Sequence, residues 1–102
     1  MSTFVFAKFE ISDQSGYDRY VALATPIFMR EKVRVHASDT SPKALTLDMA
    51  ADKVVLLEFR DRAHFKHFFE QADYMEAAKI RDGASKMSAT VFERLEMAGS
   101  KA

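Results

Sequence analysis

The sequence predicts an α+β fold in which a four-stranded antiparallel sheet carries two helices on one face. Three observations lead to this prediction. The run 54–59 is apolar at nearly every position, too short for an ordinary helix and rich in β-branched valine, so we expect a strand buried on both faces. Apolar residues recur at helical spacing in 14–31 and again after Asp61. The elements follow in the order strand, helix, strand, strand, helix, strand.

The first predicted strand covers residues 3–11. Its side chains alternate between two faces, because successive residues of a strand point to opposite sides. One face is wholly apolar, with Val5, Ala7, Phe9 and Ile11. The other is apolar for half its length, as expected if it meets a partner near one end.

The first predicted helix covers residues 14–31. Ser12 or Asp13 can cap it by accepting hydrogen bonds from its free backbone N–H groups. Pro26 lies inside the helical pattern and lacks a backbone N–H, so we expect a kink near residues 22–25.

The sequence pattern of residues 33–60 predicts a bent hairpin. Residues 33–37 alternate as a strand, and residues 38–42 are rich in turn-forming side chains. A second short alternation at 44–48 predicts another strand segment, and a turn at 50–52 leads into the strand 53–60.

In the C-terminal half, Asp61 is placed to cap the second helix. This helix is expected to break near residues 71–72 and to end at Gly83, a common helix stop. The last strand is expected at 87–95, and residues 97–102 are expected to form a flexible tail.

Two interleaved βαβ-like units of this kind give the ferredoxin-like βαββαβ fold, with a single domain at residues 1–96. The sheet face without helices carries many apolar side chains, and soluble monomers avoid large patches of this kind. Face-to-face packing of two sheets in a homodimer would cover it.

Composition excludes several classes of function. The 102 residues include 15 basic and 15 acidic side chains, so nothing in the net charge attracts nucleic acid or an anionic membrane. There is no cysteine, which suits the cytoplasm and excludes disulfides and thiol catalysis. The N-terminal residues resemble neither a signal peptide nor a membrane span. With three glycines, the chain has no phosphate-binding glycine loop.

Several residues along the chain together point to a known family: Ser12, Asp13, Tyr17, Tyr20, Pro26, the run 54–59, Ala63, Phe68, Tyr74 and Arg81. In these residues the chain resembles the domain of unknown function family 1330, of the dimeric α/β-barrel superfamily. The resemblance covers about residues 3–95. It departs from the family at Glu31-Lys32 and at Ala37-Ser38, where Gly-Gly pairs are usual. The resemblance implies the fold and a dimer but no particular reaction; superfamily relatives include cofactor-independent monooxygenases, haem-degrading proteins and lactone isomerases.

Candidate ligand-binding side chains are polar groups on otherwise apolar helical stripes. Tyr20 and Tyr74 carry hydroxyl groups that need a partner when buried, so they can supply the polar contacts of a pocket. Alternatively, their rings pack in the core and the hydroxyls reach solvent or backbone. Arg81 either forms a salt bridge with Glu58 or Glu93 or holds an anionic ligand.

His64 and His67 are three residues apart on the second helix. Either one can act as a metal or haem ligand or as an acid–base group at a pocket mouth, or both are surface residues. No carboxylate at matching spacing completes a metal site, so we predict none. The candidate pocket residues are Tyr20, His64, Tyr74 and Arg81.

These residues lead us to expect a cytoplasmic homodimer, paired through the sheet face, that binds a small apolar or carboxylated molecule between helices and sheet. One hypothesis, motivated by the superfamily relatives, is monooxygenase- or isomerase-like chemistry without a cofactor. The alternatives are a non-catalytic ligand-binding protein and a purely structural homodimer. The sequence does not identify a substrate.

Overall fold

Helices and strands follow the predicted order, with the second helix divided in two. The computed structural model describes residues 2–96, so the predicted tail 97–102 lies outside the described residues. A short 3-10 helix, η1 (Leu47–Met49), precedes the third strand. The strands are β1 (Thr3–Ile11), β2 (Arg34–Asp39), β3 (Lys53–Phe59) and β4 (Ser85–Glu93), and the helices are α1 (Gln14–Arg30), α2 (Arg62–Glu70) and α3 (Ala72–Ala84).

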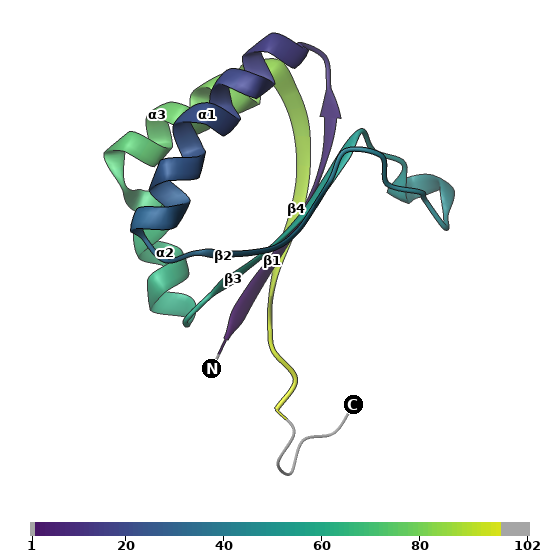
Figure 1. The fold of residues 1–102 in the computed structure, drawn as a ribbon. Coiled ribbons are helices and arrows are strands. Elements are labelled where there is room, and N and C mark those ends of the chain that lie inside the picture. The colour runs from purple at the N-terminus through teal and green to yellow at the C-terminus, as the bar shows by residue number, and fades with distance from the viewer. Residues whose placement is uncertain (1, 97–102) are drawn as a thin grey trace.

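The four strands form one sheet in the order β2-β3-β1-β4, and every neighbouring pair is antiparallel. Figure 1 shows α1, α2 and α3 together on one face of this sheet. The arrangement confirms the predicted α+β, ferredoxin-like fold. Within residues 2–96, the helices lack the length or hydropathy needed to span a bilayer.

The two faces of the sheet differ in burial. On the face toward the helices, Val5, Phe9 and Phe59 are buried. On the opposite face, Phe6 and Leu56 are only partly buried. The prediction that the run 54–59 is buried on both faces therefore holds, in the single chain, only for the side that the helices cover.

Helix starts and the helix break lie where the sequence predicts them. The side chain of Asp13 accepts a hydrogen bond from the backbone N–H of Gly16 at 3.1 Å, and α1 continues through Pro26 without interruption. Asp61 caps α2 in the same way, at 2.8 Å. The chain leaves helical geometry at Gln71, which separates α2 from α3.

The prediction of a second strand segment at 44–48 is wrong. These residues belong to an irregular connection, 40–52, which includes η1 and pairs with no strand among the described residues. Its end is held to β1, because the backbone N–H of Ile11 donates to the Asp52 carboxylate at 2.7 Å. Alternation alone does not make a strand: without a neighbour to take up its backbone hydrogen bonds, the segment has no sheet to join.

The predicted end of the second helix at Gly83 is also wrong, since α3 continues to Ala84. The carbonyl of Ala84 accepts hydrogen bonds from the backbone N–H groups of Ser12 and Asp13, both at 3.0 Å. This contact from the start of α1 stabilises the helix end, so a glycine stop is not needed. Strand β4 follows at once and therefore starts and ends earlier than the predicted 87–95.

At the end of α1, Lys32 has a φ of 58°, in the left-handed region that glycine adopts most easily. The backbone N–H of Val33 donates to the carbonyl of Phe28 at 2.9 Å, and that of Lys32 donates to Met29 at 3.2 Å. This pair of bonds is a Schellman motif, which commonly has glycine at the left-handed position. The Gly-Gly pair expected here from the family resemblance is thus replaced by residues that include a strained lysine.

We expect Lys32→Gly to stabilise the protein by about 0.5–1 kcal/mol. Glycine adopts the left-handed φ without strain, and this gain exceeds the stability lost because glycine gives the unfolded chain more conformational entropy. Urea unfolding at one fixed protein concentration measures the change. Lys32→Ala is the matched control, since it also removes the lysine side chain but keeps the strain. A glycine variant no more stable than the alanine variant would contradict the assignment.

Candidate functional site

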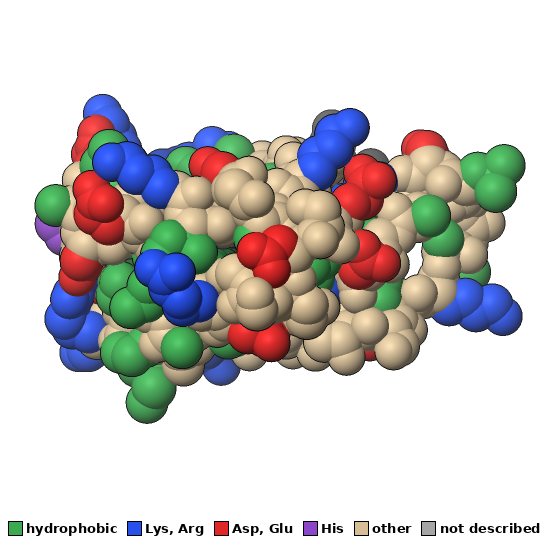
Figure 2. All heavy atoms as spheres, turned by 90° about the horizontal axis from the view of Figure 1, so that it is seen from above, with side chains coloured by type: hydrophobic (Ala, Val, Ile, Leu, Met, Phe, Trp, Pro, Cys, Tyr) green, Lys and Arg blue, Asp and Glu red, His purple; other side chains and the backbone are tan. Residues whose placement is uncertain are grey.

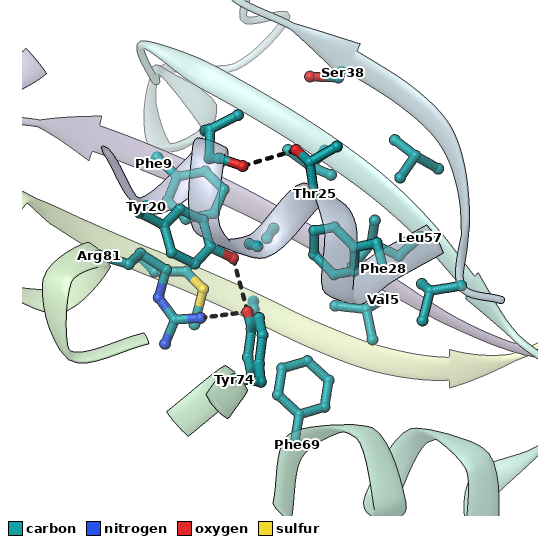
Figure 3. Close-up of a pocket in the computed structure, with 18 of the residues that line it drawn as sticks. Val5, Phe9, Tyr20, Thr25, Phe28, Ser38, Leu57, Phe69, Tyr74 and Arg81 are labelled. Atoms are coloured by element: carbon teal, nitrogen blue, oxygen red, sulfur yellow. Dashed lines mark hydrogen bonds between the residues drawn. The ribbon is translucent and has the colours of Figure 1, made fainter. Parts of the chain in front are cut away.

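A cavity of about 560 Å³ lies between the helix layer and the sheet (Figure 3). Small-molecule sites typically have volumes of roughly 300–1,000 Å³. The lining is mainly apolar and aromatic and comes from both layers, including Val5, Phe9, Leu57, Phe28, Phe65 and Phe69.

Small side chains on the facing surfaces explain why this space stays open. In the middle of the pairing between β1 and β4, Ala7 lies opposite Ala89, and both line the cavity. On the helix above, the buried stripe of α1 has alanine at position 24. Alanine side chains cannot reach across the gap between two layers, so the volume between them is left for a ligand or solvent.

One opening of the cavity lies between α1 and the edge strand β2. Its lining side chains there are exposed: Thr25 and Met29 come from α1, and Val35 and Ser38 come from β2. Figure 3 shows Thr25 and Ser38 on this side, away from the tyrosines of the opposite wall. A ligand can therefore enter along the uncovered strand.

Three of the four predicted site residues come together in the cavity wall. The hydroxyl oxygens of Tyr20 and Tyr74 are 2.7 Å apart, and Nη1 of Arg81 donates to the Tyr74 hydroxyl at 3.0 Å (Figure 3). We call Tyr20, Tyr74 and Arg81 the polar corner. It joins α1 to α3, and all three residues are buried.

The hydroxyl hydrogens of the polar corner determine which ligand groups it can bind. The two phenols carry two hydroxyl hydrogens, and one of these forms the bond between Tyr20 and Tyr74. The other has no partner among the described residues and remains beside the positive charge of Arg81. A free donor next to a cation favours an oxygen acceptor, such as a carbonyl or carboxylate.

Burial and neighbouring groups set the protonation of Tyr74 and Arg81. Burial is the main cause that raises the pKa of the Tyr74 hydroxyl well above its usual range, and it does the same for nearby Tyr17. For Arg81, burial alone would lower the pKa, but interactions with the two phenols of the corner and with Asp82 outweigh it and raise the pKa. The Tyr74 phenol of the corner is therefore neutral and the Arg81 guanidinium is charged.

Arg81 forms neither of the salt bridges predicted for it. Its Nε and Nη2 both lie 3.1 Å from an oxygen of Asp82, whose side chain is 65% exposed, whereas the Arg81 side chain is 10% exposed. Glu58 pairs instead with His36, and Glu93 pairs with Arg62. The buried guanidinium thus has one carboxylate partner on the surface, and its Nη1 is directed to Tyr74.

His64 is placed outside the cavity. Its Nδ1 accepts a hydrogen bond from the backbone N–H of Arg60 at 3.0 Å. Its Nε2 lies 2.7 Å from the carbonyl oxygen of Glu31 and donates to it, because that oxygen can only accept. Nε2 therefore ties the start of α2 to the end of α1, and Nδ1 binds the turn that precedes α2. This buried histidine has structural contacts in place of the predicted pocket position.

His67 is exposed, with Nε2 at 3.8 Å from a carboxylate oxygen of Glu31. Across residues 2–96, no three His, Asp or Glu side chains gather in a way that could hold a metal ion. The two histidines thus contact the same residue, Glu31, through different atoms.

Sequence reasoning missed Lys53, which lines the cavity. It is the first residue of β3 and comes directly before the apolar run 54–59. The signal was its position: Lys53, Val55 and Leu57 alternate on one face of the strand, and the other two are apolar. A lysine on the buried face of a strand is unusual enough to be a candidate.

We expect Tyr17 and Tyr74 to stay protonated in the folded protein up to about pH 11, because burial raises both pKa values above the usual value near 10. Alkaline titration followed by tyrosinate absorbance, with circular dichroism to monitor folding, measures this. The single variants Tyr17→Phe and Tyr74→Phe should each remove about one tyrosine from the late-titrating signal. Ionisation of all tyrosines near pH 10 in a folded protein would contradict the burial of these phenols.

Solved structures share the fold of this chain. The protein RPA0582, of unknown function, from Rhodopseudomonas palustris superposes with a TM-score of 0.80 at 18% identity, covering 93% of this chain and 83% of that one. A dimeric protein of unknown function with a ferredoxin-like fold, from Bacteroides fragilis, gives 0.64 at 10% identity, covering 91% and 96%.

SnoaB, a cofactor-independent oxygenase from Streptomyces nogalater, also has this fold, with a TM-score of 0.70 at 12% identity, covering 97% of this chain and 98% of that one. At such identities these likenesses establish the fold alone. No curated protein matches the sequence. The family model described as a domain of unknown function, DUF1330, matches residues 2–95, and the chain belongs to this family.

Proposed function

We propose that this protein binds a small, ring-containing apolar molecule with an acceptor oxygen in the cavity between its helices and sheet. The observation that carries the proposal is the polar corner: a free phenolic hydrogen beside a buried cation, in a wall that is otherwise apolar. Cavities with a few convergent polar groups and mostly apolar walls are typical of small-molecule sites. The aromatic lining suits a flat or ring-containing body.

The charge of the lining favours an acidic ligand. Arg81 and Lys53 line the cavity, and no aspartate or glutamate of the described residues does so. In an apolar environment an unbalanced positive charge is costly, and an anion that neutralises it binds with little competition from water. A carboxylate, a phenolate or an enolate would each meet this requirement.

We also propose that the protein acts as a homodimer through the sheet face opposite the helices. That face carries Phe4, Phe6, Val54 and Leu56, all only partly buried in the single chain, and Phe92, which is 42% exposed. The dimeric, ferredoxin-like protein from Bacteroides fragilis supports such an assembly. The absence of cysteine suits the cytoplasm, where we expect the protein to act.

The connection 40–52 adds apolar surface for such a partner. Figure 1 shows it projecting from the sheet on the side away from the helices, and Figure 2 shows hydrophobic side chains at the end of the molecule that it forms. Leu45 is 93% exposed and Leu47 is 97% exposed. The connection is held in position, since Nζ of Lys8 donates to the carbonyl of Asp48. A second copy seated on the sheet would lie next to these leucines.

Catalysis is the second candidate function. A hydrogen-bond donor beside a cation stabilises negative charge on an oxygen, as a reaction through an enolate or phenolate requires. The likeness to a cofactor-independent oxygenase, and the isomerases of the superfamily, are consistent with chemistry of this kind. Neither His64, which is tied to the backbone, nor Tyr74, which stays protonated, supplies a base for it. Binding without turnover, or a purely structural dimer, are the competing functions.

The polar corner is tested with benzophenone and diphenylmethane, which differ mainly by one carbonyl oxygen. We expect the wild type to bind the ketone about tenfold more tightly, the value of one good hydrogen bond. The triple variant Tyr20→Phe, Tyr74→Phe, Arg81→Met should lose this preference while still binding the hydrocarbon, which controls for an intact cavity. Isothermal titration calorimetry measures both affinities. Equal affinities in the wild type, or no binding of either, would contradict the proposal.

The dimer is tested with Phe6→Glu, which places a charge in the proposed interface. We expect the wild type to sediment as a dimer at micromolar concentration and this variant to dissociate, with a dissociation constant raised at least about 100-fold, since a buried unpaired charge costs several kcal/mol. Leu23→Glu is the control, because Leu23 is already 46% exposed on α1. A monomeric wild type, or a Phe6→Glu variant that stays dimeric, would rule out this interface.

A further inference from the structure

Lys53 lies where two cavities meet. It is opposite Phe9 in the pairing of β1 with β3. It lines both the cavity of about 560 Å³ between helices and sheet, which we call the main cavity, and a second cavity of about 650 Å³. Tyr17 and Val21 of α1 also line both. These three shared residues show that the two spaces adjoin beneath the first half of α1.

The two cavities differ in chemistry. The main cavity is walled mostly by apolar and aromatic side chains. The second one is bounded by the start of α1 and by the ends of the connection 40–52, and its lining is rich in polar groups, including Gln14, Thr40 and Ser41. A molecule that fits both would have an apolar body and a polar end, and the change from one to the other would fall at Lys53.

The ammonium group of Lys53 forms no salt bridge with any of residues 2–96. Its Nζ lies 4.8 Å from the centre of the Tyr17 ring, a cation–π contact. Asp18 acts on it only through space, while burial lowers the pKa of Lys53. Asp52, which also lines the second cavity, is occupied by the backbone N–H of Ile11. A partly buried cation of this kind gains more from a ligand carboxylate than an exposed lysine would.

Lys53 and Arg81 are not equivalent as anion partners. Arg81 already has Asp82 as a charged neighbour, and it donates to Tyr74. Lys53 forms no salt bridge with a described residue and is held by the ring of Tyr17. The charge of an acidic ligand is therefore better matched to Lys53, and a neutral oxygen is better matched to the polar corner.

We infer that the natural ligand is an amphipathic carboxylic acid whose carboxylate binds Lys53, whose apolar body fills the main cavity, and whose polar extension, where it has one, enters the second cavity. This inference rests on the proposed ligand-binding function and adds the position and chemistry of the acidic group. It makes Lys53 the residue that selects acids over their neutral analogues.

The test compares para-biphenylcarboxylic acid with its methyl ester, which has the same ring system and no charge. At neutral pH we expect Lys53→Met to weaken binding of the acid at least about tenfold and to change binding of the ester less than about twofold. Lys53→Arg should restore most of the affinity for the acid, because it keeps the positive charge. Lys79→Met is the control, since Lys79 is an exposed lysine of α3.

The outcomes separate this inference from the proposed function. If the Lys53→Met variant binds the acid as tightly as the wild type, the inference fails, while ester binding that persists leaves the proposed function standing. If Lys53→Met loses affinity for the ester as well as for the acid, Lys53 maintains the shape of the cavity and does not discriminate between charged and neutral ligands. This result also overturns the inference. If the wild type binds neither compound, both proposals fail.

Discussion

The hydrogen bond between Tyr20 and Tyr74 joins the two helices that roof the cavity, and the rest of the site depends on it. Because Tyr74 also accepts from Arg81, the phenols hold a guanidinium in a wall that is otherwise apolar. Among residues 2–96, no buried carboxylate shares this role, since Asp82 is largely exposed. The cluster thus ties α1 to α3 and at the same time gives the cavity its polar, positively charged side.

The side chains of the sheet alternate between two faces that differ in composition and burial. Its side chains toward the helices include alanines that leave space, and those on the far side are apolar residues that only a partner would bury. In the single chain the run 54–59 is therefore covered on one side, although its composition is that of a strand covered on both. The proposed ligand site and the proposed dimer interface thus lie on opposite faces of the same four strands.

Patterns in the sequence correctly predicted the features that depend on interactions between residues close together in the chain. Alternation located β1, helical periodicity placed Tyr20, Tyr74 and Arg81 on inward stripes, and Asp13 and Asp61 were recognised as caps because capping acts within a few residues. The wrong predictions concerned features that depend on groups far away in the sequence. The segment 44–48 alternates but pairs with no strand among residues 2–96, and α3 passes Gly83 because Ser12 and Asp13 bond to its end. His64 is held by the backbone carbonyl of Glu31, at the end of α1.

The sequence by itself determined the order of elements, the fold and the apolar character of both sheet faces, since each follows from spacing along the chain. Only the tertiary structure decided that a cavity remains between the layers, that Arg81 turns to Tyr74 instead of a glutamate, and that Lys53 lies between two cavities. The reason is physical: an empty volume is what side chains from several distant elements leave unfilled, and the partner of a buried charge is whichever group those elements bring within reach.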